Sequence, residues 1–237
     1  MDNLNSKTNS FVTYYKDNKI SPVNQDISDI ELHFQRRDSL FRSLGIPPLF
    51  VQDRTVLEFG PGSGHNSLYT SSLKPARYEL VDANPTGLEN TKSMLSGNAE
   101  IDIKIHDSLF MDFKTEKKFD LVWAENCIPG QANPLEILQH VAKFIKPNGI
   151  LVITLTNGIS ILSECFRRLI YHKFLKSEDS VLKNADKMVS FYKHHTKHLT
   201  GMSRSTKDWI LDNITQPIHD HKMLNLPEVV EALGNKF

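Results

Sequence analysis

The sequence predicts an α/β fold: a doubly wound, mostly parallel sheet with helices on both faces. Two observations lead to this prediction. Short apolar runs recur along residues 55–155, and they alternate with segments whose apolar residues repeat at helical spacing. In addition, three glycines at alternate positions follow the first apolar run, where such a sheet makes a tight turn from strand to helix. Alternating strands and helices require parallel strands joined by crossovers.

Five runs are expected to form the strands. They lie at residues 55–58, 78–82, 101–105, 119–124 and 150–155. The first ends at the glycine turn, and the next three end at or just before an acid, namely Asp82, Asp107 and Glu125. Because parallel strands end at one edge of a sheet, these residues should lie together at the edge where such folds bind their ligands.

Helices are expected between and around these strands. The first, capped by Asp26 or Ser28, ends near Gly45, and we expect solvent rather than a ligand against its polar face of His33, Arg36 and Arg37. Further helices are predicted at 66–72, 85–96 and 134–145, with Asn84 as a cap and a turn at 146–149. Residues 159–171, 181–199, 206–213 and 227–234 predict four more helices, with Cys165, Leu169, Met188, Phe191 and Tyr192 on apolar faces.

These patterns divide the chain into three parts. Residues 1–25 are expected to be a flexible tail, 26–158 a ligand-binding core with an N-terminal helix, and 159–237 a helical lid over the strand ends. We find no pair of closing antiparallel strands after the fifth strand. Lys236 and Phe237 could begin one, so we expect the chain to be a truncation of a longer protein.

The composition restricts which classes of partner, compartment and metal site are expected. The 237 residues carry 28 basic and 28 acidic side chains, so nucleic acid is a poor candidate. Two cysteines without CxxC spacing, Cys127 and Cys165, argue against a disulfide framework or a zinc site and favour the cytoplasm. No apolar run is long enough to span a membrane. His194 and His198 lie one helical turn apart, but no acidic third ligand is near, so we expect no metal.

The run from Glu58 to Gly64 resembles the first motif of class I S-adenosylmethionine-dependent methyltransferases. Asp82 is similar to the family's ribose-binding acid, and Asp107 with Ser108 resembles the position that touches the adenine edge. The resemblance covers about residues 54–155. It implies S-adenosyl-L-methionine as cofactor, and these candidate contacts: Glu58, Phe59, Gly60, Pro61, Gly62, Gly64, Asp82, Ala83, Asp107, Ser108, Glu125 and Asn126.

Other readings of the glycine turn are weaker. A nicotinamide or flavin dehydrogenase needs a small residue at position 65, where this chain has His65, and no Gly-Lys-Ser/Thr follows as in a kinase-type P-loop. Spermidine-synthase-like enzymes share the fold, and the glycine turn alone does not separate them. Their paired acids after the fourth strand are not evident in residues 125–130.

The expected activity is methyl transfer to a small-molecule acceptor, such as a sugar, a lipid precursor or a secondary metabolite. Nucleic-acid methyltransferase motifs are missing after the fourth strand, and Cys127 is read as a small wall residue rather than a nucleophile. Glu125 is the candidate catalytic base, although methyl transfer depends mainly on positioning. The alternative is a non-catalytic binding or assembly subunit that kept the fold. Oligomeric state is left open.

Overall fold

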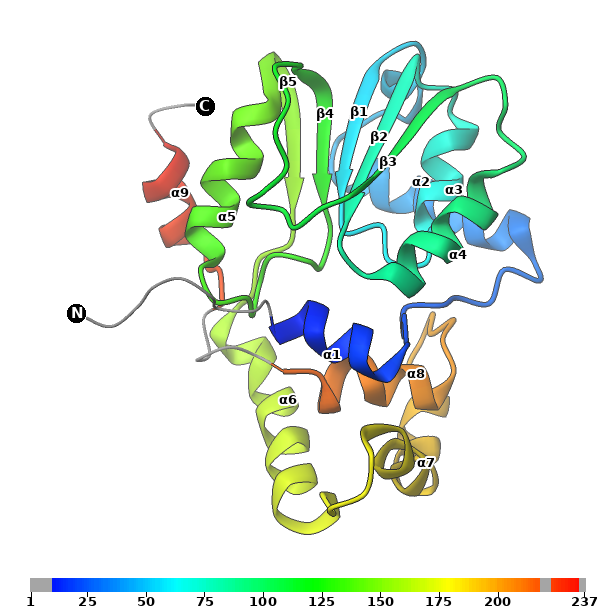
Figure 1. Ribbon diagram of the computed structural model, residues 1–237, viewed down its shortest axis with the longest axis vertical. Helices are drawn as coiled ribbons and strands as arrows, with labels where there is room; N and C mark the ends of the chain where they lie inside the picture. The colour runs from blue at the N-terminus through cyan, green and yellow to red at the C-terminus, as the bar shows by residue number, and fades with distance from the viewer. Residues whose placement is uncertain (1–9, 218–222, 235–237) are drawn as a thin grey trace.

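A computed structural model describes residues 10–217 and 223–234, and it confirms the predicted fold. Its strands form one sheet in the order β3-β2-β1-β4-β5, and every pair is parallel (Figure 1). The bounds are Thr55–Phe59, Arg77–Asp82, Asp102–Asp107, Phe119–Ala124 and Ile145–Ile153 for β1 to β5. The strand order reverses between β1 and β4, which is where ligands of such sheets bind.

Helices cover both faces of the sheet. On one face α2 (Ile30–Ser43), α3 (His65–Ser72) and α4 (Pro85–Leu95) enclose an apolar cluster around Phe41, Tyr78 and Trp123. On the other face α5 (Pro134–Val141) and α9 (Leu226–Leu233) pack over Phe59 and Leu138. Alternate residues of one strand point to opposite faces, so Val56 and Leu57 of β1 enter different clusters.

The glycine turn is held by a close approach of α4. Gly87, in the first turn of α4, lies so near the turn that a Cβ there would be 2.6 Å from the carbonyl oxygen of Gly62. Thr91, one turn later, donates its hydroxyl to the same carbonyl at 3.1 Å. Only a residue without a side chain at position 87 therefore lets helix and turn pack at this distance.

We expect Gly87→Ala to lower the free energy of unfolding by about 1 to 3 kcal/mol, because the added methyl overpacks a contact with backbone. Chemical denaturation measures the loss. Gly97→Ala is the matched control, because a Cβ at Gly97 meets nothing within 4 Å. Equal stability of the two variants would contradict the proposed packing.

The fifth strand begins earlier than predicted. The segment 146–149, expected as a turn before the strand, lies inside β5, and the pairing with β4 shifts register between Phe119 and Leu121. Asn148 takes a positive φ of 62° at this irregularity. The turn residues therefore bend the strand, because its pairing with β4 continues on both sides of them.

Two predictions for the N-terminal region are wrong in part. Of the tail expected at 1–25, residues 1–9 lie outside the described part, but Ser10–Asn18 form helix α1. Tyr14 and Tyr15 of α1 bond to Thr215 and Gln216 near the other end of the chain, a contact that local sequence does not reveal. Helix α2 starts at Ile30, and its cap is Asp29 rather than Asp26 or Ser28.

The segment after β5 forms a separate helical layer below the strand ends. It contains α6 (Gly158–Ile170), a π-helical turn Tyr171–Leu175, α7 (Val181–Lys197), α8 (Thr206–Ile210) and a second π-helical turn Leu211–Thr215. Met188, Tyr192 and Trp209 belong to its own apolar cluster. We call residues 158–217 the lid.

The lid differs from the predicted one in its C-terminal boundary and in the exposure of its apolar residues. Helix α9, assigned to the lid by the expected 159–237 boundary, instead packs beside α5 and completes the core (Figure 1). Leu169 and Phe191, expected on apolar faces of the lid helices, are 54% and 57% exposed, and Cys165 is exposed as well. Lys236 and Phe237, suggested as the start of a further strand, lie outside the described residues.

No helix within residues 10–217 and 223–234 combines the length and apolar character that crossing a bilayer requires.

Candidate functional site

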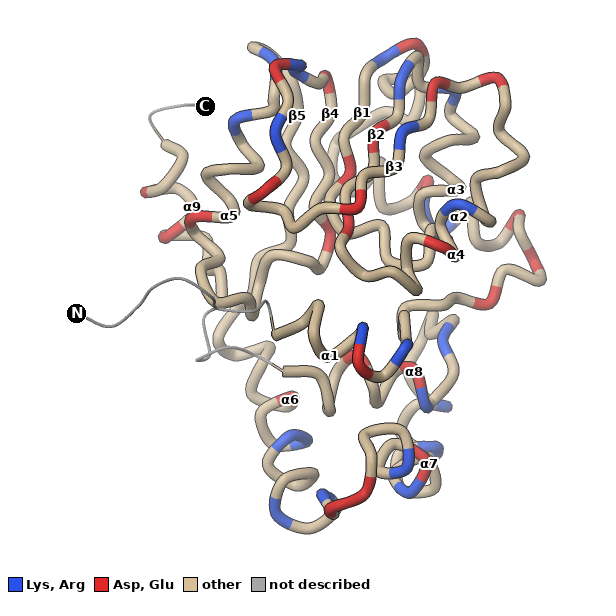
Figure 2. Tube along the Cα trace, viewed as in Figure 1, with Lys and Arg blue, Asp and Glu red and all other residues tan. Residues whose placement is uncertain are grey.

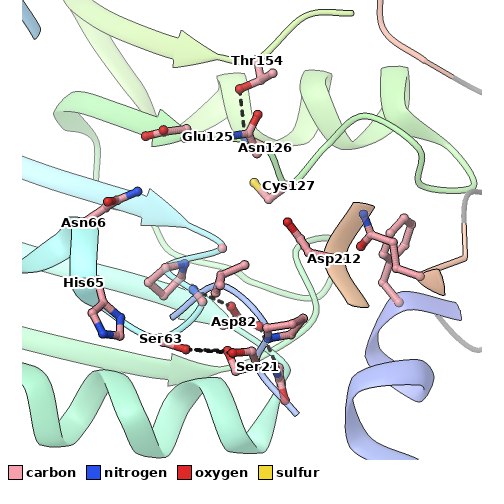
Figure 3. A pocket seen from close by; sticks show the side chains of 18 of the residues that line it. Ser21, Ser63, His65, Asn66, Asp82, Glu125, Asn126, Cys127, Thr154 and Asp212 are labelled. Atoms are coloured by element: carbon pink, nitrogen blue, oxygen red, sulfur yellow. Dashed lines mark hydrogen bonds between the residues drawn. The ribbon is translucent and has the colours of Figure 1, made fainter. Parts of the chain in front are cut away.

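A cavity of about 590 Å³ lies between the carboxyl ends of the strands and the lid. Three parts of the chain line it: the strand ends, the N-terminal segment around α1 and α2, and the lid. Figure 3 shows Asp82, Glu125 and Cys127 on one side and Asp212 of the lid facing them. The volume is typical of a small-molecule site.

The acid at the end of β2 organises the glycine turn. One carboxylate oxygen of Asp82 accepts hydrogen bonds from the backbone N–H groups of Ala83 and Asn84, and the other accepts one from Gly62 at 3.3 Å. Burial raises the pKa of Asp82 to about 6, against the lowering effect of these bonds. The carboxylate is therefore fixed in orientation at the cavity wall, with lone pairs left on the oxygen that Gly62 contacts.

Glu58 lies behind the glycine turn rather than at the cavity. Its carboxyl group is buried and accepts hydrogen bonds from the hydroxyls of Ser67 and Tyr78. Burial raises the pKa of Glu58 to about 7, and those two hydrogen bonds lower it. The residue thus joins β1, β2 and α3 below the turn.

This burial predicts a pH dependence of folding. Because the pKa of Glu58 rises from 4.5 to about 7 on folding, the folded state binds a proton more readily than the unfolded state. Its contribution to stability is full below pH 4.5 and is lost as pH rises to about 7, by roughly 2 to 3 kcal/mol. Glu58→Gln removes this titration, so urea denaturation should show wild type losing stability relative to the variant between pH 4.5 and 7. A constant difference across that window would contradict the assignment.

The polar face of α2 was predicted to face solvent, and this prediction is wrong for two of its residues. His33 and Arg37 are buried, and both line the cavity. The two terminal nitrogens of Arg37 donate to the two carboxylate oxygens of Glu125 at 3.1 and 2.8 Å. The indole N–H of Trp123 donates to Glu125 as well, at 2.9 Å. Helical periodicity does not distinguish an arginine that reaches the end of β4 from one that faces solvent, so the sequence did not reveal this contact.

The segment between α1 and α2 covers the glycine turn. Ser63 donates its hydroxyl to Ser21 (Figure 3), and a Cβ at Gly62, where φ is +60°, would come within 2.5 Å of Val23. Asn84 occupies the predicted cap position of α4, but its side chain makes no cap bond. Its amide donates to the carbonyl of Ile20 instead, because the neighbouring N-terminal segment competes for it.

Cys127 forms part of the cavity wall, as expected. Its thiol lies 3.2 Å from the carbonyl oxygen of Phe59, to which it donates, and burial raises the pKa of Cys127. A thiol with a raised pKa is a poor nucleophile. Asn126, beside it, has φ of 54° and donates its backbone N–H to the hydroxyl of Thr154.

The lid supplies charged groups that the sequence did not single out. Asp212 pairs with Arg204, and both line the cavity. Burial raises the pKa of Asp212, while Arg204 lowers it. Glu164 of α6 also reaches the cavity wall and pairs with Arg168 at 3.1 Å. No local motif marks these residues, since only the packing of the lid brings them over the strand ends.

The cavity wall contains seven of the twelve predicted cofactor contacts. They are Gly60, Pro61, Gly62, Asp82, Ala83, Glu125 and Asn126. Three others, Glu58, Phe59 and Gly64, lie behind the cavity wall. The last two also lie outside it: Asp107 is exposed at the end of β3, and the Ser108 hydroxyl donates to the carbonyl of Leu109. Leu109 and Phe110 stand at the cavity in place of Asp107 and Ser108.

Three buried polar atoms of cavity residues have no hydrogen-bond partner within the described part of the chain. They are Nε of Arg37, Nδ1 of His65 and Oδ1 of Asn84. Buried polar groups are normally paired, so unpaired ones around one cavity point to a polar ligand. The rings of His194 and His198 lie 4.7 Å apart, but no group of three or more His, Cys, Asp or Glu within residues 10–217 and 223–234 could hold a metal ion.

A family model described as a methyltransferase domain matches residues 33–209. The chain belongs to the methyltransferase family. The expected resemblance is thereby confirmed, and the match extends beyond β5 into the lid, where the sequence motifs had stopped. No match to this methyltransferase was found among curated proteins.

Several solved structures are similar to this chain. An O-methyltransferase family protein from Burkholderia thailandensis is 13% identical with a TM-score of 0.53, over 98% of this chain and 59% of that one. The N-methyltransferase NodS from Bradyrhizobium japonicum, solved with S-adenosyl-L-homocysteine, is 16% identical with a TM-score of 0.49, over 62% and 76%. In four other matched structures, this methyltransferase spans between 31% and 57% of the matched chain.

Proposed function

We propose that the chain transfers a methyl group from S-adenosyl-L-methionine to a small-molecule acceptor, within the cavity between the strand ends and the lid. The observation that carries this proposal is the Asp82 carboxylate, oriented at the cavity wall by three backbone N–H groups beside the glycine turn. A carboxylate in this position is suited to accept hydrogen bonds from a ribose diol.

The chemical character of the cavity residues suits the parts of S-adenosyl-L-methionine. Apolar Leu109 and Phe110, next to the end of β3, are suited to a flat base, and the unpaired atoms of Arg37 and Asn84 are suited to a carboxylate and an ammonium group. When bound, S-adenosyl-L-methionine supplies an electrophilic methyl group on a sulfonium. The protein's part is to hold the reactants in line and to exclude water.

The lid is proposed to hold the acceptor. Asp212 and Glu164 of the lid bring carboxylates to the wall of the cavity that Asp82 also lines. Because burial raises the pKa of Asp212, it is the better candidate to take a proton from an acceptor hydroxyl or amine.

Glu125 is less suited to act as the base than the sequence suggested. Its oxygens already accept three hydrogen bonds, from Arg37 twice and from Trp123. A carboxylate so paired keeps few lone pairs free to accept a proton from the methyl acceptor. We propose that Glu125 orients Arg37 toward the cavity.

A two-part experiment tests the function. Isothermal titration with S-adenosyl-L-methionine should show saturable binding, and a labelled-methyl screen against small-molecule extracts should show transfer to an acceptor. Binding without transfer to any acceptor would favour a non-catalytic binding subunit. Absence of binding would end the proposal. Transfer to added nucleic acid, rather than to small molecules, would overturn the proposal of a small-molecule acceptor. The cytoplasmic location of the protein stays a prediction.

A further inference from the structure

Helix α6 is turned with its apolar side outward. Ile159, Leu162, Phe166 and Leu169 recur at spacings of three and four, so they form one stripe along the helix. They are 84%, 54%, 56% and 54% exposed. Phe174, in the π-helical turn that follows, is 78% exposed. We call these five residues the α6 stripe.

The polar side of the same helix faces the protein. Arg168 donates to the carbonyl oxygens of Ile214 and Gln216, at 3.3 and 2.6 Å. The guanidinium of Arg167 lies over the ring of Trp209, 5.4 Å from its centroid. An amphipathic helix normally buries its apolar face, and here two arginines hold it in the opposite orientation. The outward face is therefore built into the lid and does not result from a loosely attached helix.

Charge on the lid favours an anionic partner. Residues 158–216 contain ten basic and six acidic side chains, although the whole chain is neutral. Lys173 and Lys176 follow directly after α6, are exposed, and form no ion pair within the described residues. Figure 2 shows α6 largely free of charge near the sheet and basic toward its far end. Lysines beside an apolar stripe are typical of helices that lie in the surface of an anionic membrane.

A second cavity favours a lipid surface over a second copy of the chain. It has a volume of about 680 Å³, and Ile161, Cys165 and Leu169 of α6 form part of its wall. Leu169 belongs to the α6 stripe as well, so the stripe borders the cavity. Glu164, Gln216 and Met223 line both this cavity and the one at the strand ends. An apolar surface that leads into the protein suits an amphiphile more than a flat protein interface.

We propose that the α6 stripe, with Lys173 and Lys176, docks the protein onto an anionic membrane surface. The helix lies in the interface with its apolar side chains among the acyl chains, while the rest of the lid and the sheet stay in water. The stripe supplies the apolar area, and the lysines supply selectivity for anionic headgroups. This binding needs no methyl donor, so it does not depend on the proposed transfer reaction.

Vesicle flotation tests the proposal. Wild type should partition at least tenfold more strongly onto phosphatidylcholine vesicles containing phosphatidylglycerol than onto phosphatidylcholine alone. The double variant Leu162→Ser/Phe166→Ser should lose at least tenfold of this binding and keep its fold, because both side chains are more than half exposed. Lys173→Glu should reduce only the preference for anionic vesicles.

A matched control distinguishes an effect of the α6 stripe from an effect of exposed apolar surface in general. Leu49 and Met111, which are 78% and 44% exposed, lie outside the lid, so Leu49→Ser/Met111→Ser should bind vesicles as wild type does. No binding of wild type to anionic vesicles would overturn the proposal, as would equal loss in the control variant. Sedimentation that shows a dimer, abolished by Leu162→Ser/Phe166→Ser while vesicles fail to bind, would assign the stripe to a second copy instead.

Discussion

Replacing Arg37 with leucine should lower the free energy of unfolding by about 3 to 5 kcal/mol. The side chain of Arg37 is 8% exposed and that of Glu125 is 23% exposed, so solvent screens the pair poorly. Leucine fills part of the space but, within the described part of the chain, leaves Glu125 with only the indole N–H of Trp123 as a partner. The uncompensated carboxylate near the end of β4 is the main source of the loss. Urea denaturation at neutral pH measures it.

Two further variants make this result specific. Arg36→Leu changes a neighbouring arginine that has no ion-pair partner within the described residues, and it should alter stability by about 0.5 kcal/mol at most. The double variant Arg37→Leu/Glu125→Gln should recover part of the loss, because it removes the unpaired charge. A single variant Arg37→Leu as stable as Arg36→Leu would show that the pair is not formed.

Asp82→Asn should weaken binding of S-adenosyl-L-methionine roughly a hundredfold, since a carboxylate contributes about 1.5 to 3 kcal/mol for each charged hydrogen bond. The amide retains one oxygen for Ala83 and Asn84, but its NH₂ group then faces the N–H of Gly62. The variant therefore changes both the hydrogen-bond acceptor that the protein offers to the cofactor and the shape of the glycine turn. Isothermal titration measures affinity, and thermal melting reports whether the turn remains folded.

Asp107→Asn is the matched control for this experiment. Asp107 ends the neighbouring strand, is exposed, and lies outside the cavity wall, so its loss should change affinity less than about threefold, or about 0.6 kcal/mol. A large loss there would support the predicted contact with the adenine edge and would place the cofactor closer to β3. An Asp82→Asn variant that binds as wild type does would contradict the ribose assignment.

The sequence by itself determined the sheet and the edge at which the cavity lies. Alternation of apolar runs and helical segments is a local property, and the glycine turn with Asp82 has a spacing that the fold imposes. For that reason the strands, their parallel pairing and the Asp82 position agree with the structure. The family match across residues 33–209 agrees with the motifs as well.

Only the tertiary structure decided which polar residues face the cavity. Arg37 and Asp212 lie on helices that are distant in sequence from the strand ends, and a helical pattern shows which residues share a face but not what that face meets. The same limit explains α6, whose apolar residues share one face that points outward because Arg167 and Arg168 bind the rest of the lid. Local periodicity shows that a helix has two faces, and the packing of distant segments determines where each one points.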